Sequence, residues 1–411
     1  MVEGWREVEL ASLSGDGDGG MRNGVFCEVS RKGAGAPMIN VGDMYAGAPI
    51  TGGGLELFNA TEEEARRFAV RDGDLFFTRS SVVPAGIAFC NWFKGADGET
   101  VVFDSHVIRF RPDTRRVVPM FLHLQCSSPK ARSFLVSNAK TAAMTTIDQA
   151  VLGRCPVDLP PLPEQRAIAA ALSDADALVV ALEKLLAKKR ALKHGAMREL
   201  FSGKRRLRGF SGEWETRELE RAADFHDSAR EPVAESLRES GATPYYGANG
   251  IQDYVRGHTH EGEFVLIAED GANDLANYPV RHVRGRIWVN NHAHVLSGKP
   301  GVTNTRFLAY ALSMIDYQAF LVGGTRAKLN GAVLRKMSLT MPGESEQAAI
   351  AAILADMDAE IGALTARLEK TRRVRRGMMS ELMTGGIRLV APANTKTQPE
   401  TTPTGKHLKN K

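Results

Sequence analysis

The 411-residue chain has no long apolar segment and only 4 cysteines. No run approaches the roughly 18 consecutive apolar residues of a membrane-spanning helix, and the charged N-terminus lacks an apolar signal core, so we expect a cytoplasmic protein. The cysteines are Cys27, Cys90, Cys126 and Cys155. They show neither the Cys-x-x-Cys spacing of a zinc site nor the pattern of a disulfide framework. We expect them to be reduced and at least partly buried.

Catalytic motifs are also missing. The sequence has no Gly-x-x-x-x-Gly-Lys-Ser/Thr phosphate loop, no Gly-x-Ser-x-Gly elbow, no His-Glu-x-x-His site and no Asn/Asp-Pro-Pro-Tyr/Phe segment. Two histidine clusters, 258–261 and 290–294, could supply metal ligands, but we favour polar strand-end residues that contact bases or phosphates. The net charge of +5 permits a polyanionic partner without requiring one.

Much of the chain is built twice. Residues 164–207 align without a gap on residues 346–389, and 22 of these 44 positions are identical. Upstream of each copy, Trp5 to Leu10 resembles Trp214 to Leu219. The segments between these anchors diverge, with faint matches of 73–76 to 262–265 and of 106–108 to 294–296. The first segment is longer, and we place its extra residues in a Gly-rich loop over 33–54. The order is therefore variable module, alike segment, variable module, alike segment.

The alike segments predict two long helices. Apolar residues recur at alternating spacings of 4 and 3: Ile168, Leu172, Ala175, Val179, Leu182 and Leu186, then Ile350, Leu354, Met357, Ile361, Leu364 and Leu368. This heptad pattern indicates that the helices, each of about 38 residues, pair as an antiparallel coiled coil. The alternative is that each lies along its own module. Their basic residues are either a solvated face or a surface that docks a partner or faces DNA; our docking candidates are Lys188, Arg190, Lys193, Arg372 and Arg375.

The variable modules mix short β-rich runs with a few helices. Strands are predicted at 74–79, 101–103, 106–110, 264–268 and 286–289, and helices at 119–126 and 305–315. Each module is therefore α/β or α+β. Polar and basic residues near the ends of these elements suit contacts to phosphates and base edges. The DNA-binding candidates are Arg79, Lys140, Thr141, Arg326, Lys328 and Asn330. The alternative is that they belong to ordinary basic loops.

These segments resemble a known family. Leu-Pro-Pro-Leu-Pro-Glu-Gln-Arg-Ala-Ile at 159–168, the run over 187–207 and Gly-Phe-Ser-Gly-Glu-Trp at 209–214 are similar to the specificity subunit of type I restriction-modification enzymes. So are Gly-Asp-Leu-Phe-Phe-Thr-Arg-Ser-Ser at 73–81 and Phe-Val-Leu-Ile-Ala-Glu-Asp-Gly at 264–271. The resemblance spans nearly the whole chain up to about residue 389.

The resemblance implies two target recognition domains, at 1–158 and 208–340, two spacer helices, at 159–207 and 341–389, and an internal pseudo-twofold repeat. Each domain would read one half of an asymmetric split site in double-stranded DNA, and the helices would set the spacer. The subunit would be non-catalytic and would bind two methyltransferase subunits and two restriction (translocase) subunits, which hold S-adenosylmethionine, ATP and Mg²⁺. The alternative is a self-contained nuclease or methyltransferase with fused recognition domains. Residues 390–411 predict a disordered tail.

Overall fold

The computed structural model describes residues 3–15, 20–95, 100–142, 144–322 and 328–390, and the chain divides into two compact units. Unit 1 comprises residues 1–180 and 370–411, and unit 2 comprises residues 181–369. Each unit contains one module together with part of both long helices. The predicted tail lies outside the described residues from 391 onward.

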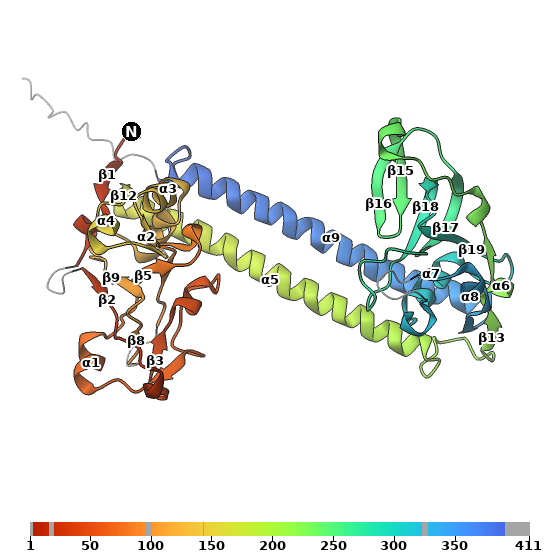
Figure 1. The fold of residues 1–411 in the computed structure, drawn as a ribbon, viewed down its shortest axis with the longest axis horizontal. Helices are drawn as coiled ribbons and strands as arrows, with labels where there is room; N and C mark the ends of the chain where they lie inside the picture. Colours follow the sequence, from red (N-terminus) through yellow and green to blue (C-terminus); the bar gives the residue numbers. More distant parts are fainter. Residues whose placement is uncertain (1–2, 16–19, 96–99, 143, 323–327, 391–411) are drawn as a thin grey trace, which may run out of the picture. The chain divides into compact units, whose positions relative to one another are not determined.

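The module of unit 1 is built around a four-stranded and a three-stranded sheet (Figure 1). The first has the order β2 (Met21–Asn23), β9 (Val107–Phe110), β5 (Leu75–Thr78) and β7 (Cys90–Trp92), and the second has β4 (Glu56–Phe58), β3 (Lys32–Ile39) and β8 (Val102–Phe103). β5 is buried at every position because its two faces meet two different apolar clusters. The helices are α1 (Glu62–Arg67), α2 (Pro119–Cys126), α3 (Pro129–Ser137) and α4 (Gln149–Gly153). β1 (Arg6–Glu9) pairs with β12 (Pro156–Leu159).

The module of unit 2 repeats this topology in one six-stranded sheet. Its order is β14 (Ala223–Phe225), β19 (Ala293–Gly298), β17 (His260–Ala268), β18 (Val280–Val289), β15 (Ser240–Gly247) and β16 (Gly250–Val255). The helices are α6 (Leu219–Ala222), α7 (Thr305–Ser313) and α8 (Gly331–Lys336), and β13 (Glu215–Glu218) pairs with β20 (Ser338–Met341). In both modules the central strand, β5 or β17, lies between two antiparallel neighbours. The predicted mixed α/β modules and their strands and helices are confirmed.

The predicted loop over 33–54 is wrong in its first part, because β3 occupies residues 32–39. Gly33 and Gly35 have φ of +93° and +97°, and the pairing of β3 with β4 shifts between Lys32 and Ala36. A Cβ on Gly35 would lie 2.5 Å from the carbonyl oxygen of Phe58. These glycines thus permit a β-bulge inside a strand, which a glycine-rich sequence does not distinguish from a loop.

The two long helices are observed as α5 (Leu162–Phe201) and α9 (Glu344–Met383). All predicted heptad positions are buried or half-buried along them. In unit 1 Ile168 and Leu172, near the start of α5, share a core cluster with Leu382 and Met383 at the end of α9. In unit 2 the end of α5 shares a cluster with the start of α9. The predicted antiparallel pairing is therefore confirmed within each unit.

A buried glutamine fastens the start of each long helix to its module. In unit 1 the Gln165 Oε1 accepts the N–H of Val118 at 2.9 Å, while its Nε2 donates to the carbonyls of Arg116 and Pro160 at 3.2 and 2.8 Å. In unit 2 Gln347 makes the equivalent bonds to Asn304, Val302 and Pro342 at 2.9, 3.0 and 2.8 Å. We refer to each arrangement as a glutamine lock. It explains why the glutamine at position 165 recurs at position 347 in the repeat.

The preceding glutamates form a second repeated contact. Glu164 is 1% exposed and accepts two bonds from Arg388, which follows α9, and one from the Trp5 indole. Glu346 is 3% exposed and accepts two bonds from Arg206, which follows α5. The start of each helix is thus ion-paired to the segment that follows the other helix. This buried pairing adds specificity to the antiparallel arrangement.

The described cysteines are free, with Cys27 half-buried and the other three buried, as predicted. Within the described ranges, no helix combines the length and apolarity needed to cross a lipid bilayer.

Candidate nucleic-acid interface

The end of the central strand forms a backbone framework that recurs in both units. In unit 1 the N–H of Arg79, directly after β5, donates to the carbonyl of His106 at 2.8 Å. The Arg79 carbonyl accepts the N–H of Ile147 at 3.0 Å. In unit 2 Glu269 follows β17 in the same place, and its bonds to His292 and Leu329 are 2.8 and 2.7 Å long. Arg79 and Glu269 are therefore structurally equivalent.

This equivalence corrects the faint alignment of the two modules. Thr78 pairs with Val107 in unit 1, and Ala268 pairs with Ala293 in unit 2. The match of 73–76 to 262–265 is off by one residue, and that of 106–108 to 294–296 is off by two. A shift of one residue exchanges the two faces of a strand, so isolated Gly and His identities were misleading guides.

In unit 1 this framework carries a small exposed ribbon of three strands: β6 (Ser80–Ser81), β11 (Thr145–Thr146) and β10 (Lys140–Thr141). Pairing of β11 with both neighbours brings Lys140 and Thr141 onto the same ribbon as the segment that follows Arg79. We call this surface the unit 1 ribbon. Three of the predicted DNA-binding residues, far apart in the sequence, are thus brought together.

The side chains of the unit 1 ribbon are available to a ligand. Arg79, Lys140 and Thr141 are all exposed. Lys140 makes one ion pair of 3.3 Å with Asp148, and its side chain is 79% exposed. Arg79 donates to the carbonyl of Ser105 at 3.3 Å. Weakly held cations beside hydroxyl groups can bind phosphate oxygens and base edges.

In unit 2 the equivalent ribbon has internal charge pairing. Lys328 forms isolated bridges with Asp270 and Val322, and its ammonium lies 2.9 Å from Glu269. Arg230 also bonds to Glu269, at 2.6 Å. Burial raises the pKa of the Glu269 carboxyl, but these bonds from Arg230 and Lys328 outweigh it and lower the pKa overall.

The other two predicted DNA-binding residues of unit 2 are Asn330 and Arg326. Asn330 caps α8, accepting the N–H of Ala332 at 2.9 Å, and Asp148 caps α4 at the equivalent place. The Asn330 Oδ1 therefore serves the fold, as an Asn directly before a helix could have indicated, while the residue itself is exposed and its contact with DNA stays a prediction. Arg326 lies outside the described residues.

The histidine clusters are explained by hydrogen bonds to the protein. His294 is 2% exposed and lies between the Asp227 carboxylate at 2.7 Å and the Leu329 carbonyl at 3.0 Å. His292 contacts Asp270 at 2.5 Å. The part of the chain that the structure describes contains no group of three or more His, Cys, Asp or Glu residues arranged to hold a metal ion. The contact of these clusters with bases or phosphates stays a prediction.

Two of the predicted docking residues pair across the coiled coil. In unit 2 Lys193 of α5 contacts Asp358 of α9 at 2.5 Å, and in unit 1 Arg375 contacts Asp176 at 2.8 Å. These pairs are repeats of one another with the helices exchanged. Among the other candidates, Lys188 and Arg190 are exposed and Arg372 is half-buried.

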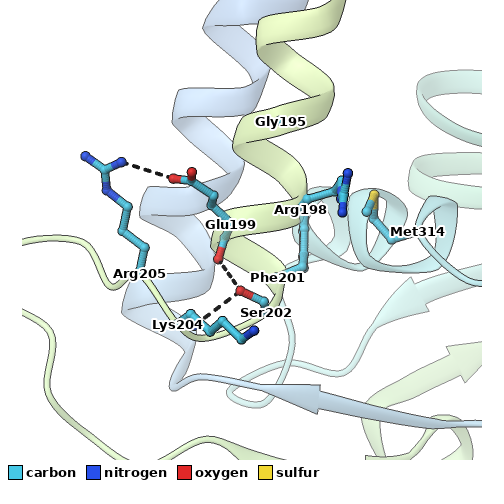
Figure 2. Close-up of a pocket in the computed structure, with 8 residues that line it drawn as sticks. All are labelled: Gly195, Arg198, Glu199, Phe201, Ser202, Lys204, Arg205 and Met314. Carbon is cyan, nitrogen blue, oxygen red and sulfur yellow. Dashed lines mark hydrogen bonds and ion pairs between the residues drawn. The ribbon is translucent and has the colours of Figure 1, made fainter.

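A groove recurs where each long helix ends against its module. In unit 2 it has a volume of about 970 Å³, and Figure 2 shows Arg198 and Phe201 of α5, and Ser202 directly after it, lining the groove together with Met314 at the end of α7. In unit 1 a groove of about 470 Å³ is lined by the repeat equivalents of those three residues, Ser380 and Met383 of α9 and Thr384 directly after it. Figure 2 also shows Arg205 paired with Glu199 beside the groove. We refer to both as the helix-end grooves.

Comparison with known proteins agrees with the resemblance found in the sequence. Residues 211–371 match the model of the type I restriction modification DNA specificity domain. A Haemophilus influenzae protein named as a type I restriction enzyme specificity subunit, S.HindORF215P, is 49% identical over 148 residues, which cover 36% of this chain and 38% of that protein. The match thus spans little more than a third of that relative.

Solved structures show the same fold over nearly the full length. The S subunit of a type I restriction-modification system from M. genitalium matches with a TM-score of 0.62 at 15% identity, covering 92% of this chain and 96% of that one. A chain from a study of complex assembly and conformational transition of the type I R-M system matches with a TM-score of 0.52 at 15% identity, covering 94% and 99%. The resemblance found in the sequence is confirmed: residues 211–371 match the specificity-domain model, and the fold is similar to that of type I restriction-modification S subunits.

Proposed function

We propose that this chain is the non-catalytic DNA-recognition subunit of a type I restriction-modification complex, in which each module reads one half of a bipartite, asymmetric site. The observation that carries this proposal is the shared backbone framework, which presents Arg79 in one module and Glu269 in the other. A retained framework with exchanged side chains is what two readers of different base sequences require, because base edges are distinguished by side-chain donors, acceptors and apolar groups.

Mapping of methylated adenines in the host genome, with and without the gene for this chain, tests the recognition role. A split motif that is methylated only when the gene is present supports the proposal. The Thr141→Ala variant is expected to relax the bases of one half-site and to leave the other half-site unchanged. Persistence of every methylated motif after deletion of the gene would contradict the proposal.

The paired helices set the number of unspecified base pairs between the half-sites. The glutamine locks and the ion pairs Lys193–Asp358 and Arg375–Asp176 support this role, because they hold each helix to a module and to its partner helix. Four residues inserted after Ala187, matched by four after Leu364 so that the helices still pair, add about 6 Å to the helices. We expect a spacer longer by about one or two base pairs, at about 3.4 Å per base pair, with both half-sites unchanged. Altered half-sites at an unchanged spacer would contradict this role.

Two methyltransferase subunits dock on the repeated helical surface, and two restriction (translocase) subunits join them. The helix-end grooves support this stoichiometry, because a partner present twice needs a surface present twice. S-adenosylmethionine, ATP and Mg²⁺ are bound by those partners, and the complex acts on DNA in the cytoplasm.

Charge reversal tests the docking surface. Lys188 and Arg190 are exposed on α5, so Lys188→Glu with Arg190→Glu should leave the fold intact and lower the amount of methyltransferase that co-purifies with the chain. Two methyltransferase copies per chain in the double variant would contradict docking at these residues. An unchanged circular dichroism spectrum is the control for folding.

A further inference from the structure

An apolar loop borders the unit 1 ribbon. Residues 82–89, which follow β6 and which we call the valine loop, place Val82 and Val83 in solvent with 81% and 58% of their surfaces exposed. Single exposed valines are common on proteins, so the surroundings of these two decide their meaning.

The valine loop is held firmly by polar contacts. Arg132 donates to the carbonyls of Ala85, Ile87 and Ala88 at 2.7 to 2.8 Å, and the Thr78 hydroxyl donates to the Gly86 carbonyl at 2.7 Å. Ile87 and Ala88 are fully buried in the main core cluster of the unit. At the other end, the Ser81 hydroxyl bonds to the Val83 carbonyl at 2.7 Å. The exposed valines are therefore presented on a fixed support.

Strand pairing places Val82 beside the ribbon. Ser81 is paired with Thr145, so Val82 directly follows β6 and Met144 directly precedes β11 at the same end of this strand pair. Met144 is 43% exposed, and Thr141 on the third strand is exposed too. An apolar pair thus stands at the end of a ribbon of hydroxyl groups that also carries Lys140.

The equivalent loop of unit 2 is different in chemistry. After Asp270 it runs through residues 271–277, where Asn273, Asp274 and Asn277 are exposed. The Asp274 carboxylate accepts bonds from the backbone and side chain of Asn277 at 2.9 Å. This loop also exposes Leu275, at 41%, so its tip is mixed, whereas Val82 and Val83 give the valine loop an apolar tip. Tips of different composition are expected of surfaces that contact different base pairs.

We propose that Val82 contacts the C5-methyl group of a thymine in the half-site that the first module reads. This inference rests on the proposed function and adds a base to it. The thymine methyl is the one apolar feature of the major groove, and aliphatic side chains are its usual protein contacts. The flanking hydroxyl groups and Lys140 hold the ribbon against the same groove and its phosphates.

Replacement of thymine by uracil tests the contact, because uracil lacks only the methyl group. The full chain, in complex with its methyltransferase subunits, is titrated with duplexes of the mapped target in which each half-site thymine is replaced in turn. We expect one position at which uracil weakens binding about fourfold, the value of one buried methyl group. In the Val82→Ser variant, which removes both methyl groups of the side chain, uracil at that position should have no effect.

Val29→Ser is the matched control, since Val29 is in the same unit and is 82% exposed. It should keep the preference for thymine. The inference is overturned if uracil is tolerated at every half-site position, if the preference survives in Val82→Ser, or if Val29→Ser removes it equally. Absence of any sequence-selective binding would instead overturn the proposed function, so the two failures are distinct.

Discussion

Replacing Gln347 by alanine removes a whole glutamine lock from unit 2. The side chain is 0% exposed and makes three hydrogen bonds of 2.8 to 3.0 Å to the backbone. Each such bond contributes about 1 kcal/mol to stability, and the alanine variant leaves the N–H of Asn304 and the carbonyls of Val302 and Pro342 without these hydrogen bonds. We expect the free energy of unfolding of unit 2 to fall by about 3 kcal/mol, a large part of a typical domain's stability.

Gln347→Glu separates hydrogen bonding from packing, because it keeps the shape but cannot donate to the carbonyls of Val302 and Pro342 at neutral pH. It should destabilise the unit at least as much as alanine does. Urea unfolding followed by the fluorescence of Trp214 and Trp288, both in unit 2, provides the measurement. The exposed Gln318→Ala variant is the control. A loss below about 1 kcal/mol in both Gln347 variants would refute the lock.

Three further perturbations test other parts of the structure. Burial and the nearby Arg375 lower the pKa of His123 to about 4. Neutral His123 therefore costs no stability above the unfolded pKa of 6.5, and stability is lost as the pH falls from 6.5 toward 4, because only the unfolded chain takes up the proton. The His123→Leu variant should flatten this part of a pH titration of stability, by up to roughly 3 kcal/mol. Gly24→Ala places a Cβ 1.9 Å from the carbonyl oxygen of Phe103, and denaturation should show a loss of about 3 kcal/mol. Lys140→Ala should reduce the slope of log K against log salt for DNA binding by about 1, which a salt series of binding curves measures.

The long helices and their pairing could be predicted because heptad spacing is a local signal and the repeat supplies it twice. The glutamine locks could not, since Gln165 bonds to Val118 and Arg116, more than 45 residues away. Pairing of Lys193 with Asp358 had a signal in the sequence. The repeat places Asp176 where Asp358 lies and Arg375 where Lys193 lies, so antiparallel helices bring both pairs together.

The candidate site was predictable in its parts and not in its assembly. Arg79 and Lys140 were each found as polar residues at element ends, but the ribbon that joins them depends on pairing between β6 and β11, which are 65 residues apart. Val82 was missed because a valine after two serines carries no chemical signal until its exposure is known. Asn330 was read as a DNA contact although it caps a helix, because caps and base readers draw on the same residue types.

The exchange of Arg79 for Glu269 changes how each module can hold DNA. In unit 2 Glu269 pairs with both Arg230 and Lys328, and Asp227 also lies 3.7 Å from Arg230, so much of this positive charge is offset within the protein. In unit 1 Arg79 stands in the place of Glu269, and Lys140 remains 79% exposed. Among the described residues, we therefore expect charge-driven phosphate contacts to be stronger in unit 1. Counterion release scales with the number of cations that reach phosphates. The affinity for the first half-site should therefore fall more steeply with salt concentration than the affinity for the second.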